Sequence, residues 1–244
     1  MDYSFYSLFY NKLPNHYYEL LPIRNKAKIV TFLNPYYMEA FKLDTSLYSQ
    51  FDYICSDGMI PILLNNITNK NKSSRISFDM GSVAKDVFNY GITQSLSFYF
   101  VGSQEQNIKR FTKIIQQNYP KLSIQGFHHG YINDYQMIIK TIIDSKADIV
   151  VIGMGAPKQD IFAIKLKESG YKGTIYTCGG FIHQTTKSIN YYPKWINKYN
   201  LRFIYRIIHE PHVIKRIIKY YPKFIFKYVY FLIFKCKSFK TVIK

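Results

Sequence analysis

The sequence predicts an α/β fold, in which a largely parallel β-sheet is covered by helices on both faces. Three observations support this prediction. Short apolar segments alternate along the chain with longer segments whose apolar residues recur at helical spacing. Several of the short segments end at glycine-containing turns, as strands of such sheets often do. No internal repeat and no Gly/Ser-rich linker interrupts this pattern before about residue 190, so one body is expected up to that point.

The first half of the chain supplies three of the expected strands. The segments at 27–33, 51–58 and 96–103 are short, apolar and rich in aromatic or β-branched residues, a composition that favours strands. Helical spacing follows at 35–43 and again at 80–90.

The second half continues the alternation more regularly. A strand at 148–155 is the most apolar segment of the chain, and the helix after it closes at Gly170. The other expected elements, in chain order, are helix 104–119, strand 122–130, helix 134–146, helix 158–170 and strand 173–180. Strands and helices of these lengths, joined in this order, are typical of a parallel sheet.

Four of the expected strands end in small or turn-forming residues, in the segments SDG, VGS, GMGAP and CGG. Ligands of open parallel sheets bind beyond the carboxyl ends of the strands, where glycine allows close approach and helix N-termini attract anions. The sequence therefore predicts a crevice for a nucleotide or nucleotide-sugar. Its expected binding residues are Gly102, Gly155, Gly179 and Gly180 from these segments, and Lys158 directly after GMGAP. No dinucleotide-binding GxGxxG and no GxxxxGK[ST] is present.

Charge is distributed unevenly along the chain, whose formal net charge is +18. Residues 194–244 hold 13 of the 33 basic side chains and a single acidic one, Glu210. We therefore divide the chain into a body at 1–193 and a basic, aromatic helical appendage at 194–244. Such an appendage suits a nucleic acid, an anionic lipid or a polyphosphate substrate; the alternative is a solvated charged face.

The appendage also has apolar residues at helical spacing, interleaved with Lys and Arg. A basic amphipathic helix with an aromatic face is typical of a membrane interface. Its longest apolar run is too short and too interrupted to span a bilayer, so no spanning helix is expected. The alternative is a set of helices that simply packs on the body.

Cofactor and metal sites are not expected. The three cysteines lie far apart, none forms a CxxC pair, and no Cys/His cluster has the spacing of a zinc site. The N-terminal segment lacks the basic start and long apolar core of a signal peptide.

Several motifs occur in one order along the chain: TFLNPYY, SDGM, RISFDM, FVGS, GMGAPKQD, CGGF, YYPKW and LRFIYRIIHEP followed by an arginine. In this order they resemble the WecG/TagA/CpsF family of bacterial glycosyltransferases. The resemblance covers about residues 27–218. Its strongest parts are GMGAPKQD and the arginine-containing segment near the end.

This resemblance implies a Rossmann-like body with a helical C-terminal appendage. It implies transfer of a sugar, typically N-acetylmannosamine or a related hexose, from a UDP-sugar to a polyprenyl-diphosphate-linked sugar, with inversion at the anomeric carbon. The enzyme would work as a peripheral protein on the cytoplasmic face of the bacterial membrane, without a metal ion, in cell-surface polysaccharide or teichoic acid synthesis. The missing D-x-D triplet agrees with metal independence. Association into homo-oligomers is possible in the family.

The resemblance also implies roles for individual residues. Asp57 matches the proposed general base, although an aspartate there could instead cap a helix. Asp79 is a second carboxylate, for which capping of the helix at 80–90 is expected. Arg75 belongs to the same motif and is expected to bind substrate.

Residues elsewhere complete the expected site. Thr31 and Asn34 would line the sugar or acceptor pocket, with turn formation before Pro35 as the alternative. Gln159 would bind donor or acceptor through its amide, and Asp160 replaces the commoner Glu of the family motif.

In the appendage, Arg206 and Arg216 would reach a diphosphate, because the planar guanidinium pairs with two phosphate oxygens at once. The distal run at 221–244 would serve membrane contact. In CGGFIHQ, Ile182 or His183 stands where many members have Asp, which favours the capsule and exopolysaccharide branch.

Two functions from other classes remain as alternatives. One is a noncatalytic nucleotide-sugar-binding or scaffold protein, against which Asp57 and Gln159 argue. The other is a basic nucleic-acid-binding module, which leaves the strand-end glycines unexplained and has no RNP or zinc motif. No nucleic acid is therefore expected as a partner.

Overall fold

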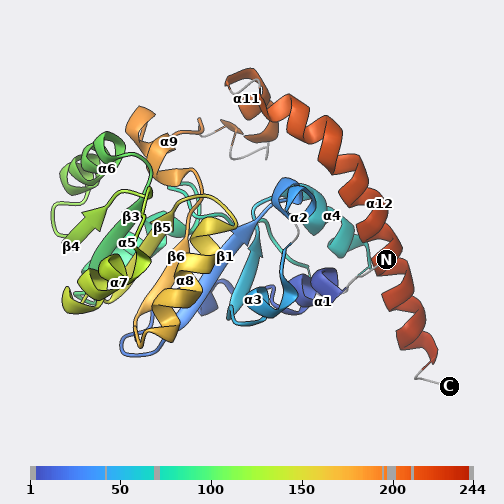
Figure 1. Cartoon of the computed structure of the whole chain (residues 1–244). Helices are drawn as coiled ribbons and strands as arrows, with labels where there is room; N and C mark the ends of the chain where they lie inside the picture. Colours follow the sequence, from blue (N-terminus) through green and yellow to red (C-terminus); the bar gives the residue numbers. More distant parts are fainter. Residues whose placement is uncertain are drawn as a thin grey trace.

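A computed structural model describes residues 4–41, 43–68, 72–193, 195–196, 202–209 and 212–241. Six strands form one sheet in the order β2-β1-β6-β5-β3-β4, and every neighbouring pair is parallel (Figure 1). The predicted α/β class is confirmed. The strands are β1 Lys28–Leu33, β2 Tyr53–Ser56, β3 Ser97–Gly102, β4 Ser123–His128, β5 Ile149–Gly153 and β6 Thr174–Thr177.

Helices cover both faces of this sheet. The body contains α1 Ser4–Asn11, the 3-10 helix η1 Tyr17–Leu20, α2 Pro35–Ala40, α3 Thr45–Ser49, α4 Met59–Thr68, α5 Val83–Thr93, α6 Glu105–Asn118, α7 Tyr135–Asp144, α8 Lys158–Glu168 and α9 Phe181–Lys187. The appendage contains α11 Arg202–His209 and α12 His212–Thr241. The helices α1, α3, α4 and α9 were not predicted; α1, α3 and α9 have eight residues or fewer and show little periodicity.

Two apolar clusters mark the two faces of the sheet. One combines residues of α1, α2, α3, α7, α8 and α12, and the other combines residues of α5, α6 and α9. The adjacent strands β1 and β6 are therefore followed by helices on opposite faces of the sheet: α2 follows β1, and α9 follows β6. Such a reversal opens a crevice beyond the carboxyl ends of the two strands, which is where ligands of open α/β sheets bind.

The appendage helix α12 packs along the body beside α2 and α4 (Figure 1). Phe224 and Tyr228 are fully buried, and the Tyr228 hydroxyl donates a hydrogen bond to Asn65 Oδ1 at 2.7 Å. Burying one such aromatic side chain stabilises the fold by roughly 1.5–3 kcal/mol. The distal run at 221–244, expected to serve membrane contact, therefore also completes the core through its described part.

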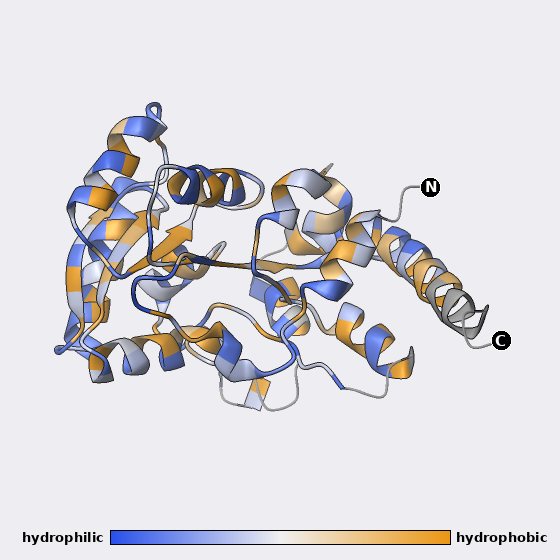
Figure 2. Ribbon diagram, turned by 90° about the horizontal axis from the view of Figure 1, so that it is seen from below, coloured by the Kyte–Doolittle hydropathy of each residue, from blue (hydrophilic) through white to orange (hydrophobic). Residues whose placement is uncertain are grey.

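The opposite face of α12 is exposed and mixed in character. Figure 2 shows hydrophobic and hydrophilic residues alternating along this helix. Ile218 is 71% exposed and Phe226 68% exposed, and Lys215, Lys219 and Lys223 are exposed as well. None of the described helices combines the length and the apolar character needed to cross a membrane.

Candidate active site

A pocket of about 340 Å³ opens at the β1/β6 crevice. Residues that directly follow three strands form part of its wall: Asn34 after β1, Asp57 after β2, and Cys178, Gly179 and Gly180 after β6. The other wall comes from the appendage, through Arg206 of α11 and Arg216 of α12. Body and appendage thus form the pocket together.

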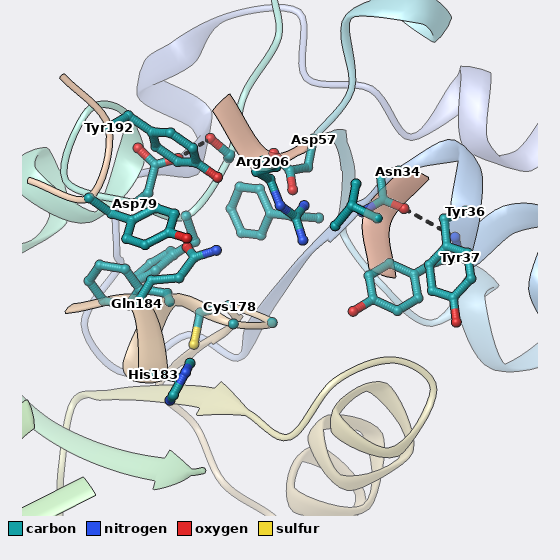
Figure 3. A pocket seen from close by; sticks show the side chains of 18 of the residues that line it. Asn34, Tyr36, Tyr37, Asp57, Asp79, Cys178, His183, Gln184, Tyr192 and Arg206 are labelled. Carbon is teal, nitrogen blue, oxygen red and sulfur yellow. Dashed lines mark hydrogen bonds between the residues drawn. The ribbon is translucent and has the colours of Figure 1, made fainter. Parts of the chain in front are cut away.

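The polar end of the pocket is a group of charged residues around Asp57 (Figure 3). The Nη2 atom of Arg75 donates to Asp57 Oδ1 at 2.8 Å and to Ser77 Oγ at 2.8 Å, and lies 3.9 Å from Asp79 Oδ2. Arg75 and Asp79 are 13% and 14% exposed, whereas Asp57 is 30% exposed. Asp57 is therefore the carboxylate that a ligand in the pocket can reach most easily.

The surroundings of Asp57 act on its pKa in opposite directions. Removal from water raises the pKa above its ordinary value, and the negative charge of Asp79 adds to this. The positive charges of Arg75 and Arg206 act against that rise, and the net direction is upward. A carboxylate with a raised pKa is a stronger proton acceptor, which suits a general base.

The appendage arginines bring positive charge into the pocket. The guanidinium of Arg216 lies over the ring of Tyr36 at 4.5 Å, a cation–π contact that orients it toward the pocket. Arg206 lies beside Asp57 (Figure 3). Two guanidinium groups in one pocket suit a diphosphate, because each can form charge-assisted hydrogen bonds with phosphate oxygens.

Tyrosines supply most of the remaining wall: Tyr36, Tyr37, Tyr191, Tyr192 and Tyr221. Each offers an apolar ring and a polar hydroxyl, a combination that suits a sugar or a base. Burial raises the pKa of Tyr192 and of Tyr221 to about 12, so both remain protonated donors at neutral pH.

The segment GMGAPKQD lies beside this pocket, with its amide and carboxyl side chains turned into the protein. Gln159 is buried, and its Oε1 accepts hydrogen bonds from the backbone N–H groups of Gly155 and Gly179, each at 3.1 Å. It thereby joins the loop after β5 to the loop after β6. Because Gly179 lines the pocket, Gln159 holds this part of the pocket wall in place without lining the pocket itself.

The neighbouring Asp160 is fully buried and joins further elements. Its carboxylate accepts from Thr31 Oγ1 of β1 at 2.7 Å and from the Tyr48 hydroxyl of α3 at 2.8 Å. Thr31 also contacts Thr177 of β6 through their hydroxyl oxygens, 2.8 Å apart. Burial raises the pKa of Asp160 to about 6, although both hydrogen bonds act in the opposite direction.

The sequence-predicted site residues divide into two groups. The pocket lining contains Asn34, Asp57, Arg75, Asp79, Gly179, Gly180, Arg206 and Arg216. Outside its lining lie Thr31, Gly102, Gly155, Lys158 and Gln159. Of these, Gly102 has φ +150°, and a Cβ there would lie 2.4 Å from the Gly153 carbonyl oxygen, so it allows β3 to end close beside β5.

Asp79 and Asn34 both lie just before a helix, and only Asn34 caps the helix that follows it. Asp79 does not cap the following helix, because α5 begins at Val83 and its N-cap position is Ser82; the Asp79 carboxylate instead accepts from the Gly81 N–H and pairs with arginine. Asn34 caps α2 by accepting from the Tyr37 N–H at 3.1 Å, and it also lines the pocket.

Several pocket residues were not predicted from the sequence: the five tyrosines, Gln184 and Lys187. Tyr36 and Tyr37 directly follow Asn34, and Tyr191 and Tyr192 belong to the YYPKW motif, so adjacency to motifs was the available signal. His183 lines the pocket, whereas Ile182 is buried in the core. His183 Nδ1 lies 3.4 Å from the Asn107 amide nitrogen.

Within the described part of the chain, no group of three or more His, Cys, Asp or Glu side chains is arranged to hold a metal ion. Cys55 and Cys178 are buried and unpaired with each other, and Cys236 lies outside the described side chains.

Comparison with known proteins identifies relatives over most of the chain. The model of the glycosyl transferase WecG/TagA/CpsF family matches residues 1–237. A UDP-Gal:alpha-D-GlcNAc-diphosphoundecaprenol beta-1,4-galactosyltransferase of Shigella boydii is 38% identical over 200 residues, 81% of this chain and 84% of that protein. An N-acetylglucosaminyldiphosphoundecaprenol N-acetyl-beta-D-mannosaminyltransferase of Bacillus subtilis is 24% identical over 213 residues, 86% of this chain and 80% of that protein.

Proposed function

The chain belongs to the WecG/TagA/CpsF family of glycosyltransferases, and on that premise we propose that it transfers a sugar from a UDP donor to an undecaprenyl-diphosphate-linked sugar. The observation that carries this proposal is the shared pocket. The carboxylate of Asp57 and two arginines of the appendage, Arg206 and Arg216, line this one cavity. A proton acceptor and a diphosphate-binding wall are the two parts that such a transfer needs.

The reaction follows from these parts. Asp57 accepts the proton of the acceptor hydroxyl as that oxygen attacks the anomeric carbon of the donor. The bond from that carbon to the diphosphate breaks on the opposite side, so the configuration inverts. Arg206 and Arg216 stabilise the negative charge that develops on the departing UDP. The products are the extended lipid-linked saccharide, UDP and a proton held on Asp57.

Arginine can supply the charge that a divalent ion supplies in many other glycosyltransferases. We therefore include metal independence in the proposal, supported by two guanidinium groups on the diphosphate-binding wall. The N-terminus of α9 carries a partial positive charge that adds to the charge of the two arginines, because α9 begins at Phe181 directly after the pocket glycines.

The proposed donor is UDP-galactose and the proposed acceptor is N-acetylglucosaminyl-diphosphoundecaprenol. The galactosyltransferase relative is 38% identical, against 24% for the N-acetylmannosaminyltransferase relative over a similar length. Both names share the same kind of acceptor. Ile182 or His183 stands where many family members have Asp, and this departure also supports a donor other than N-acetylmannosamine.

A lipid acceptor requires that the pocket meet a membrane surface. The outer face of α12 supports this, since exposed Ile218 and Phe226 can enter the interface while Lys215, Lys219 and Lys223 meet anionic headgroups. Each such lysine contributes about 1 kcal/mol near an anionic surface. We propose peripheral attachment at the cytoplasmic face, where UDP-sugars are available.

A donor competition tests the sugar assignment. Purified protein receives an acceptor with a short polyprenyl chain, together with equal amounts of UDP-galactose and UDP-N-acetylmannosamine. Incorporation of hexose alone supports the proposal, whereas incorporation of N-acetylhexosamine alone would reassign the donor and leave the transferase function standing.

The noncatalytic alternative predicts a different result. A nucleotide-sugar-binding scaffold would bind UDP without consuming either donor. Calorimetric binding of UDP together with unchanged donor over many hours would favour that alternative. Binding to polynucleotide at physiological salt, without binding to anionic vesicles, would instead favour a nucleic-acid-binding module.

A further inference from the structure

Arg202 is the first residue of α11, and it attaches the appendage to the loop that carries Arg75 and Asp79. It is 7% exposed, its Nη1 donates to Ser77 Oγ at 3.1 Å, and it forms an ion pair with Asp79 Oδ2. Its guanidinium lies over the ring of Tyr192 at 4.7 Å. These contacts hold Arg202 behind the pocket wall rather than within the pocket lining.

Two partners of Arg202, Ser77 and Asp79, are also partners of Arg75. Ser77 Oγ lies 2.8 Å from Arg75 Nη2, and Asp79 Oδ2 lies 3.9 Å from the same nitrogen. That nitrogen also donates to Asp57 at 2.8 Å. Positive and negative groups therefore alternate in the order Arg202, Asp79, Arg75 and Asp57, beginning in the appendage and ending at the pocket.

We propose that Arg202 is a positioning residue: it neutralises the charge of Asp79, so that Arg75 can pair with Asp57. Docking of α11 on the body thereby keeps Asp57 able to act as a base. This inference rests on the proposed role of Asp57. When α11 is docked, two arginines serve two carboxylates. When Arg202 is withdrawn, Arg75 is the arginine left to pair with both Asp57 and Asp79. Its short contact with Asp57 then competes with its contact with Asp79.

Electrostatics gives the direction of the effect. An uncompensated charge on Asp79 disfavours ionisation of Asp57, and a weakened bond from Arg75 does the same. Both changes favour protonation of the base, so withdrawal of Arg202 makes the pocket less able to accept a proton at mildly acidic pH. Among the described residues, the other charged or titratable groups that share the pocket with Asp57 include Tyr37 of α2, His183 and Lys187 of α9, Tyr192, Arg206 of α11, and Arg216 and Tyr221 of α12.

The direct test is the titration of Asp57 in the full chain. The protein is labelled with ¹³C at the aspartate carboxyl carbons, and the Asp57 signal is identified by its loss in Asp57→Asn. We expect Arg202→Gln to raise the pKa of Asp57 by about 0.5–1 unit. Arg202→Lys, which keeps the charge, should titrate like the unaltered protein. Arg110→Gln, at an exposed position on α6, controls for the change in net charge.

The double variant Arg202→Gln with Asp79→Asn separates electrostatics from simple attachment. It cannot re-form the ion pair, yet it removes the uncompensated charge, so the pKa of Asp57 should return to or below that of the unaltered protein. The acidic limb of kcat/KM should move in the same way, while the maximal rate of the double variant stays lowered by looser attachment of α11.

Two results would overturn the proposal. One is an unchanged pKa of Asp57 in Arg202→Gln. The other is a double variant whose pKa stays as high as that of Arg202→Gln. Since the titration needs no turnover, a chain that transfers no sugar from any donor would refute the proposed function and would still leave the titration to decide the role of Arg202.

Discussion

The Nη2 atom of Arg75 lies 2.8 Å from Asp57 Oδ1 in a pocket that the body and the appendage share. The contact fixes the orientation of the carboxylate and limits the rise of its pKa. Asp57 could have been a helix cap, and this contact with a pocket arginine supports the role of base instead.

Replacement of Asp57 by Asn should abolish most of the activity. The variant is nearly isosteric but cannot take a proton at neutral pH, and loss of a general base lowers the rate by about 10²–10⁴-fold. The measurement is steady-state release of UDP with acceptor present. Asp144→Asn, at an exposed position that ends α7, is the matched control and should keep full activity. A folded Asp57→Asn protein with near-normal turnover would refute the assignment.

The buried Asp160 should make the protein less stable as pH rises from about 4 to 6. Its pKa is about 6 in the folded protein, whereas an aspartate in an unfolded chain has a pKa of about 3.9. In this window the folded state binds more protons than the unfolded state, so the free energy of unfolding falls with rising pH. The loss contributed by this one group is about 1–3 kcal/mol.

Asp160→Asn should remove that contribution. Urea unfolding at pH 4.5 and at pH 7 should show a smaller decrease between the two for the variant than for the unaltered chain. An equal or steeper decrease in Asp160→Asn would show that the carboxyl is already ionised in the folded protein at pH 4.5.

Replacement of Gln159 by Met should loosen the strand-end loops. It removes the oxygen that accepts from Gly155 and Gly179, and leaving such donors unsatisfied costs roughly 1–3 kcal/mol in total at these half-buried positions. We expect a lower free energy of unfolding together with weaker UDP binding, because Gly179 lines the pocket. Gln117→Met, exposed on α6, is the control. Unchanged UDP affinity would mean that the loop keeps its position without Gln159.

Transfer should proceed in the presence of excess EDTA. In the proposed reaction Arg206 and Arg216 offset the charge on the leaving diphosphate, so Arg206→Ala should lower kcat/KM strongly whether or not Mg²⁺ is added. Activity that disappears with EDTA and returns with Mn²⁺ or Mg²⁺ would overturn this view of the diphosphate-binding wall.

Membrane binding should depend on the outer face of α12. The double variant Ile218→Ser with Phe226→Ser should sediment less with anionic vesicles, yet should keep its turnover on a water-soluble acceptor. Deleting residues 221–244 is a poorer test, because it also removes the buried Phe224 and Tyr228. Full vesicle binding by the double variant would place the membrane contact elsewhere.

The sequence predicted all six strands as short apolar segments that end in turn residues, and it predicted α2, α5, α6, α7 and α8 from apolar residues at helical spacing; α4 was not predicted. It misplaced the start of the helix after Asp79, since the residues before Val83 form a turn that the arginines stabilise. The family resemblance predicted most of the charged pocket residues.

Other features depend on tertiary contacts that no local pattern reveals. Gln159 and Asp160 read as an ordinary polar first turn of a helix, and only the packing of α8 beneath three strand ends turns both inward. Arg202 was not singled out for the same reason. Its partners Asp79 and Ser77 lie 123 and 125 residues earlier in the chain.

The most direct test of the central claim is mass spectrometry of the lipid product. The purified chain is incubated with UDP-galactose and N-acetylglucosaminyl-diphosphate on a short polyprenyl chain, beside Asp57→Asn as the inactive control. We predict a product one hexose heavier than the acceptor, formed by the unaltered chain and nearly absent with Asp57→Asn. No added sugar from UDP-galactose or from any other UDP-sugar, by a folded protein that binds UDP, would contradict the proposed transferase function.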